Sequence, residues 1–137
     1  MKVLYDTNVI LDVFLKRSGL SEASGKAVSR AETKRVDGFV CANSVTTIYY
    51  WAEKVINGAA ADTAVKMVTQ IMKVTSVDGA IIQKVIKEDY VDFEDEVIYQ
   101  SAIAAGIDCI ITRDKRGFKK AIGLKVLTPE QFLAIGG

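Results

Sequence analysis

The chain has 137 residues, half of them hydrophobic, with 18 Lys and Arg residues against 17 Asp and Glu residues. This size and composition suffice for one substantial hydrophobic core, so we expect a single domain over residues 1–137. The formal net charge of +1 excludes a global field that would attract an anionic polymer. Any nucleic-acid site must therefore be a local patch.

Predicted strands and helices alternate along the chain. Short apolar runs predict strands at 2–5, 39–42, 74–77, 109–112 and 125–127. Apolar side chains at helical spacing predict helices at 7–17, 21–35, 44–56, 62–72, 80–87, 96–106 and from Pro129 onward. Asn43 or Ser44 is the expected cap of the third helix, and three glycines are the expected helix stops: Gly38, Gly58 and Gly106.

Strands that are apolar throughout and alternate with helices are typical of a parallel sheet covered on both faces. We therefore predict an α/β fold with three layers, α/β/α, and a central parallel sheet of about four to five strands. No apolar stretch reaches membrane-spanning length. Cys41 and Cys109 lie in predicted strands, where a free thiol behaves as a small hydrophobe, so we expect a reduced, cytoplasmic protein.

Three aspartates fall at one edge of the predicted sheet. Asp6 follows the first strand, Asp95 lies where the helix leading into the fourth strand begins, and Asp114 lies just past that strand. Strand carboxyl ends and helix amino ends share the edge at which such sheets bind ligands. Clustered carboxylates repel one another without a cation, and Mg²⁺ or Mn²⁺ prefers oxygen ligands. We therefore predict a divalent-metal site, with Ser44 and Thr47 expected at the same edge.

Each acid also has a simpler interpretation. Asp6 fits a helix cap, Asp95 fits a helix-dipole partner, and Asp114 fits the start of a turn. Only their joint placement favours a site. The helix-dipole interpretation also stays open for the neighbouring acids Asp92, Glu94 and Glu96. Two further acids lie within predicted helices and are expected to be solvated: Asp12 and Glu53.

Four motifs, in order and over nearly the whole chain, resemble those of PIN-domain proteins. They are DTNVILD at 6–12, SVTT at 44–47, FED at 93–95 followed by Ala102, and ITRDKRGF at 111–118. PIN-domain proteins are metal-dependent nucleases typified by the VapC-like toxins of toxin–antitoxin pairs. The resemblance implies a ribonuclease that hydrolyses phosphodiesters with a metal-activated water. It also implies an RNA substrate, an antitoxin partner and a homodimer.

By this resemblance the metal-ligand and catalytic places fall to Asp6, Asp95 and Asp114, supported by Asn8 and Thr112. The chain departs from the family pattern at Tyr50, which stands where the family usually has a helical glutamate. A neutral phenol is a poor ligand for Mg²⁺, so we expect Glu94 or a water to take that place and activity to be weaker. The alternative is a PIN-like module that binds nucleic acid or protein without catalysis.

The chain has no histidine, which excludes imidazole acid–base chemistry and the usual serine or cysteine triads. A phosphoacceptor receiver-like domain is disfavoured, because it would need paired acids after the first strand and a lysine after the last. Basic residues near the predicted edge are candidates for holding the phosphate backbone, with a solvated surface as the equal alternative: Lys16, Arg17, Arg113, Lys115, Arg116, Lys119 and Lys120. Tyr49 is expected in the core, and Trp51 is expected to stack on a base or to lie in an interface.

Overall fold

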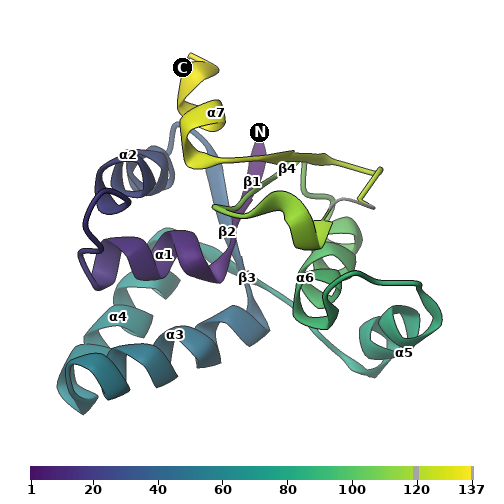
Figure 1. Cartoon of the computed structure of the whole chain (residues 1–137), viewed down its shortest axis with the longest axis horizontal. Helices are drawn as coiled ribbons and strands as arrows, with labels where there is room; N and C mark the ends of the chain where they lie inside the picture. Colours follow the sequence, from purple (N-terminus) through teal and green to yellow (C-terminus); the bar gives the residue numbers. More distant parts are fainter. Residues whose placement is uncertain (119–120, 137) are drawn as a thin grey trace.

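The computed structural model describes residues 1–118 and 121–136. Its centre is a parallel sheet in the order β3-β2-β1-β4-β5 (Figure 1). The strands are β1 (Lys2–Tyr5), β2 (Asp37–Cys41), β3 (Lys73–Thr75), β4 (Cys109–Ile111) and β5 (Lys125–Leu127). The predicted α/β fold is confirmed. Strand β1 lies in the middle, with β2 on one side and β4 on the other, so the strand order reverses between β1 and β4.

Helices cover both faces of the sheet (Figure 1). One face carries α1 (Thr7–Phe14), α2 (Ser21–Glu32), α3 (Ala42–Val55), α4 (Gly58–Ile71) and the short α7 (Pro129–Ala134). The other carries α6 (Phe93–Ala104), with α5 (Gly79–Lys87) packed on it, and the 3₁₀ turn η1 (Lys115–Phe118). Among the described residues, no helix is long and apolar enough to span a membrane.

The strands bury side chains on both faces, which explains their continuous apolar runs. In β1, Val3 and Tyr5 belong to the core beneath α1 to α4, whereas Leu4 belongs to the core beneath α6. Strand β4 alternates in the same way, and Ile110 faces α6. Both cysteines are buried and unpaired, as expected for reduced thiols, and burial raises the pKa of Cys109 to about 11.

Several predicted helix ends are wrong. Helix α2 ends at Glu32, and Gly38 lies inside β2, where a Cβ would stand 2.6 Å from the Cβ of Ala31. Gly58 begins α4, because the side chain of Asn57 caps that helix. Helix α3 follows β2 directly, with Cys41 at the cap position and no side-chain hydrogen bond there. Neither Asn43 nor Ser44 therefore caps it.

The helix that carries the third acidic motif begins earlier than predicted. Asp92 caps α6 by accepting a hydrogen bond from the backbone N–H of Asp95 at 2.9 Å, so the helix starts at Phe93 and not at residue 96. This cap is the helix-end role that the sequence had left open for Asp92. Helix α6 ends at Ala104, and Gly106, the predicted helix stop, follows it with a positive φ of 71°.

Candidate active site

Asp6 lies between the central strand and the first helix, where the chain leaves the sheet. It is the N-cap of α1, and its Oδ1 accepts a hydrogen bond from the backbone N–H of Thr7 at 2.7 Å. Its Oδ2 accepts one from the hydroxyl of Thr112 at 2.7 Å, and its own N–H donates to Ile111 across the sheet at 2.8 Å. The carboxylate is thus fixed at the point where β1 and β4 diverge.

The surroundings of Asp6 disfavour its charge. The residue is 5% exposed, and this burial raises its pKa to about 6 against the opposing hydrogen bonds from Thr112 and Thr7. The negative charges of Glu94 and Asp92 raise the pKa further. A buried carboxylate that faces other acids is stabilised by any cation that joins it.

Asp95 faces Asp6 from the first turn of α6 and is half-buried. Its pKa is raised to about 7, first by burial and then by the charges of Asp6, Asp92, Glu94 and Asp114. Its side chain lies against Gly117 in η1, where a Cβ would stand 2.7 Å from Cγ of Asp95. The charge of Asp6 therefore acts on Asp95, and the two predicted site residues are electrostatically coupled.

Asp114 reaches the same edge but is engaged by an arginine. The side chain of Arg116 donates to its carboxylate at 3.0, 3.1 and 2.6 Å, and this holds the pKa of Asp114 at about 2. Within residues 1–118 and 121–136, no three acidic or thiol groups lie close enough to form a ready coordination sphere. The negative charge of Asp114 raises the pKa of Asp95, while the carboxylate oxygens of Asp114 are bound to Arg116.

The predicted supporting residues divide into two groups. Thr112 holds Asp6, and Asn8 accepts a hydrogen bond from the backbone N–H of Arg113 at 3.3 Å. Ser44 is fully buried and accepts from the hydroxyl of Thr7 at 2.7 Å, so it braces the start of α1. Thr47 donates to the carbonyl of Asn43 in its own helix at 3.2 Å, so its hydroxyl is used within α3. Thr7 joins this network although the sequence had not singled it out.

Glu94, the predicted substitute ligand, lies in the first turn of α6 and is exposed. Its charge raises the pKa of both Asp6 and Asp95, which places it within electrostatic reach of the site. The expectation that it precedes the helix is wrong, because the Asp92 cap extends α6 to Phe93. Glu53 is exposed near the end of α3, as expected.

Asp12 is not solvated, contrary to the sequence-based expectation. Its side chain is 0% exposed, and its two oxygens accept from Arg17 at 3.2 Å, Arg113 at 3.0 Å and Ser24 at 3.1 Å. The position of Asp12 among the apolar residues of α1 was a sequence signal that it would be buried. A buried charge needs partners. Those partners come from the loop after α1, from α2 and from the loop after β4.

The other predicted phosphate-binding residues that the structure describes are Lys16, Lys115 and Arg116. Lys16 takes a positive φ of 50° where α1 ends, and Lys115 donates to the side chain of Gln131 at 3.1 Å. The side chain of Arg116 is 89% exposed beyond its contact with Asp114. Lys119 and Lys120 lie outside the described residues.

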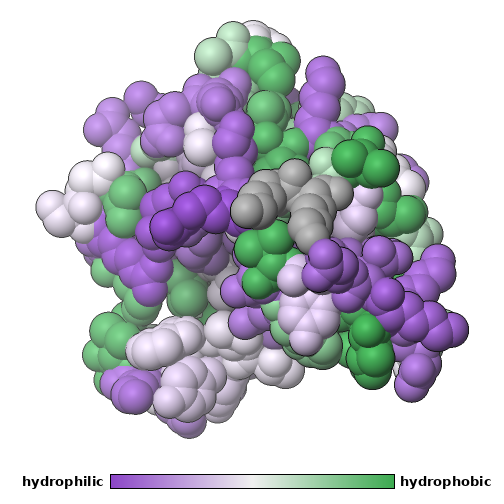
Figure 2. All heavy atoms as spheres, turned by 45° about the vertical axis from the view of Figure 1, so that its right-hand side comes forward, coloured by the Kyte–Doolittle hydropathy of each residue, from purple (hydrophilic) through white to green (hydrophobic). Residues whose placement is uncertain are grey.

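The aromatic residues of α3 separate into core and surface. Tyr49 packs against the core, as expected, and the nearby charge of Asp62 raises its pKa. Tyr50 is 52% exposed, and its ring meets Trp51 edge-on beneath the ammonium of Lys54. In Figure 2, pale and weakly polar side chains gather at the lower left, on the side of α3. Tyr50 thus points to solvent and supplies nothing to the acids.

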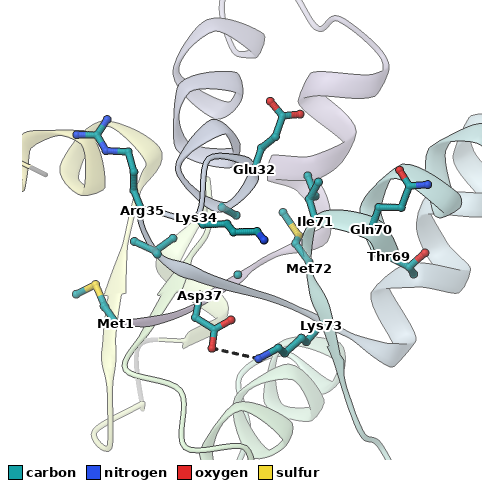
Figure 3. A pocket seen from close by; sticks show the side chains of 13 residues that line it. Met1, Glu32, Lys34, Arg35, Asp37, Thr69, Gln70, Ile71, Met72 and Lys73 are labelled. Carbon is teal, nitrogen blue, oxygen red and sulfur yellow. Dashed lines mark hydrogen bonds and ion pairs between the residues drawn. The ribbon is translucent and has the colours of Figure 1, made fainter.

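A pocket of about 570 Å³ lies at the opposite edge of the sheet (Figure 3). Its lining includes Met1, Arg35 and the ion pair in which Lys73 contacts Asp37 at 3.4 Å. These residues stand where β1, β2 and β3 begin, whereas Asp6 and Asp95 stand where strands end. The pocket therefore belongs to the edge remote from the acids.

The fold and the site define an α/β protein with an acidic site at the point where the strand order of a parallel sheet reverses. A sequence profile of the PIN domain matches residues 2–116. The chain therefore belongs to the PIN domain family, as its motifs had indicated.

Known proteins resemble the chain over nearly its whole length. Ribonuclease VapC1 from Aquifex aeolicus (strain VF5) is 29% identical over 136 residues, which cover 96% of this chain and 92% of that protein. A toxin–antitoxin complex from Klebsiella pneumoniae matches with a TM-score of 0.69 and 19% identity, over 93% of this chain and 97% of the other. VapBC2 from Rickettsia felis, bound to a DNA fragment from its promoter, matches with a TM-score of 0.71 and 13% identity, over 92% and 97%. These structural similarities show the shared fold.

Proposed function

We propose that the protein is a metal-dependent ribonuclease, in which Asp6, Asp95 and Asp114 hold Mg²⁺ or Mn²⁺ and direct hydrolysis of an RNA phosphodiester. The proposal rests above all on the position of Asp6 and Asp95 at the switch point, where burial and then the charge of Asp6 raise the pKa of Asp95. Family membership and the resemblance to a ribonuclease support it.

The donor set suits a hard divalent cation. Carboxylate oxygens are the ligands that Mg²⁺ and Mn²⁺ prefer. Burial and then the charges of neighbouring acids raise the pKa values of Asp6 and Asp95, and a bound cation would stabilise both carboxylates in their charged form. Asp114 can bind the ion only if its carboxylate releases Arg116. Glu94 is the nearby acid that could serve as a further ligand. When bound, the ion would supply charge stabilisation for the transition state of phosphodiester hydrolysis.

The protein's own residues orient these acids. Thr112 and the N–H of Thr7 each hold one oxygen of Asp6, which fixes the carboxylate plane. Asp92 anchors the first turn of α6 and so places Asp95 opposite Asp6. With no histidine in the chain, proton transfers fall to carboxylates and water.

The experiment is cleavage of a single-stranded RNA with millimolar Mn²⁺ or Mg²⁺, compared with excess EDTA, together with calorimetric metal binding. D6N and D95N should each abolish cleavage and weaken metal binding, and E94Q should reduce both. E53Q is the matched control at an exposed acid remote from the site and should behave as the wild-type protein. A pure protein that neither cuts RNA nor binds either ion would overturn the proposal.

We further propose that the protein acts in the cytoplasm as the toxin of a toxin–antitoxin pair. The solved relatives include a toxin–antitoxin complex and VapBC assemblies of the same fold. Expression of the chain alone should arrest growth, and co-expression of a cognate antitoxin should relieve the arrest. Equal growth with D6N and wild-type protein would contradict a toxin role.

A non-catalytic binding module is the second candidate. Two observations favour it: Tyr50 occupies the place of the helical glutamate and faces solvent, and Asp114 is bound to Arg116. In that case RNA or a protein partner would bind equally well in EDTA, and D6N would leave binding unchanged.

A further inference from the structure

The ionic cluster centred on Asp12 serves a purpose that the acidic site does not explain. Asp12 is fully buried in α1, and three side chains donate to it: Arg17, Arg113 and Ser24. Burial of a carboxylate is costly, and hydrophobic residues in place of such a cluster are often at least as stable. The arrangement therefore points to a role other than stability.

The cluster carries one negative and two positive charges, so it is a net cation. Its two arginine side chains are 33% and 36% exposed, while Asp12 is completely enclosed. Arg113 uses its Nε on Asp12, and no acceptor within residues 1–118 and 121–136 takes the hydrogens of its two Nη atoms. Arg17 likewise uses only Nη1 among its guanidinium nitrogens within those ranges. Both guanidinium groups therefore keep N–H donors that could bind an anion.

Backbone connections place the Asp12 cluster next to the proposed catalytic acids. Arg113 follows Thr112, whose hydroxyl holds Asp6, and the N–H of Arg113 is held by Asn8, two residues beyond Asp6. Arg113 is thus fixed at its backbone by Asn8 and at its guanidinium by Asp12. The side chain of Arg116, by contrast, is highly exposed and donates to Asp114.

We propose that Asp12 is a positioning residue that holds Arg113 and Arg17 as a binding site for an RNA phosphate beside the acidic cluster. Guanidinium forks match phosphate oxygens, and holding them in place in advance limits the entropy lost when RNA binds. An RNA strand that approaches Asp6 and Asp95 also meets three further acids, Asp92, Glu94 and Asp114, and a fixed pair of cations offsets their repulsion. This inference rests on the proposed ribonuclease function.

The test measures binding of a fluorescent single-stranded RNA in EDTA by anisotropy, at low salt and across a salt series. R113Q should weaken binding about tenfold and lower the slope of log K against log salt by roughly 0.7, the share of one single-strand phosphate contact. R35Q is the matched control: it removes the same charge from the exposed Arg35 at the opposite edge (Figure 3) and should change binding less than twofold.

D12N gives the sharpest result, because positioning and simple charge predict opposite signs. Removal of a negative charge beside bound RNA should tighten binding if charge alone matters, whereas release of two arginines should weaken it severalfold. Should D12N fail to fold, R113K tests the same point: it keeps the charge but loses the fork and the Nε contact, and should bind nearly as weakly as R113Q.

The inference is wrong if R113Q binds RNA like R35Q, or if R113K binds RNA like the wild-type protein. It is also wrong if folded D12N binds RNA more tightly, or if the wild-type protein binds no RNA at low salt. Its failure differs from that of the nuclease proposal. Arg113-dependent binding without metal-dependent cleavage would overturn only the nuclease. Normal cleavage and binding by R113Q would overturn only the role of Asp12.

Discussion

The carboxylate of Asp95 lies directly against the backbone of Gly117, with no space between them for a methyl group. Helix α6 and η1 thus meet at an acid of the proposed site, and Gly117 leaves the room that Asp95 occupies. The φ of Gly117 is not in the left-handed region, so space alone requires glycine here.

G117A should therefore displace Asp95 without unfolding the protein, because an aspartate side chain can rotate away from a new Cβ. We expect at least tenfold slower RNA cleavage, with a melting temperature within a few degrees of wild type. G25A is the control, since a Cβ at Gly25 in α2 meets nothing within 4 Å. It should leave cleavage unchanged. Full activity of G117A would mean that the position of Asp95 is unimportant.

T112V should both destabilise the fold and disturb Asp6. The buried Oδ2 of Asp6 would lose its donor, which costs about 1–3 kcal/mol of unfolding free energy. The lost hydrogen bond would also raise the pKa of Asp6 further, so metal binding should need a higher pH. Denaturant unfolding and calorimetry at several pH values measure the two effects. T46V removes a hydroxyl exposed on α3 and should show neither.

The metal-free protein should lose stability as the pH rises from about 5 to 7.5. The pKa values of Asp6 and Asp95, about 6 and 7, lie above the unfolded value of 3.8, so the folded state binds more protons over this range. Their stabilising contribution is present at low pH and disappears as the pH passes through the folded pKa values.

Melting temperatures across this range, with and without Mn²⁺, measure the effect. The ion should remove the decline because it favours the charged carboxylates, and D95N should flatten the metal-free profile. E22Q on the exposed surface of α2 is the control and should keep the wild-type slope. A metal-free stability that rises between pH 5 and 7.5 would contradict the prediction.

R116Q should strengthen metal binding. Arg116 holds the pKa of Asp114 at about 2, and its removal would free that carboxylate for an ion. We expect a severalfold lower metal dissociation constant by calorimetry. K115Q makes the same charge change at the neighbouring residue and should not improve metal binding. Unchanged affinity in R116Q would show that Asp114 is not a ligand.

The protein should form a homodimer through the exposed apolar end of α3. Val55 and Ile56 are 58% and 53% exposed, Trp51 one turn earlier is 39% exposed, and exposed apolar side chains favour association. Light scattering at high micromolar concentration should give twice the monomer mass, and V55D should restore the monomer. I122D makes the same kind of change at Ile122, which is 93% exposed outside α3, and should remain dimeric. A strict monomer at this concentration would remove the prediction.

The sheet and the placement of Asp6 and Asp95 follow from the sequence because each rests on a local pattern. Strands such as Cys109–Ile111 are buried on both faces and therefore read as unbroken apolar runs. Helix ends were less predictable, since they depend on caps such as Asn57 and Asp92, whose side chains shift a boundary by several residues.

The surroundings of individual charges needed the folded structure. Asp12 meets Arg113 across 101 positions of sequence, a distance over which no periodicity carries information. Its place amid the apolar side of α1 was the one local signal that it would be buried. Asp114 shows the converse: its position at the edge was predictable, whereas its pairing with Arg116 depends on the turn of η1.

The hydrogen bond between Thr112 and Asp6 joins residues 106 positions apart, so the proposed site has a consequence for the order of events during synthesis. A ribosome-bound chain exposes Asp6 early, yet Thr112, which directly follows β4, is translated 106 residues later. Pairing of β1 with β4 is a non-local step that must await that segment. A partly translated chain that ends before β4 therefore lacks the Thr112 hydrogen bond that holds Asp6, and the proposed site cannot assemble until that strand has been made.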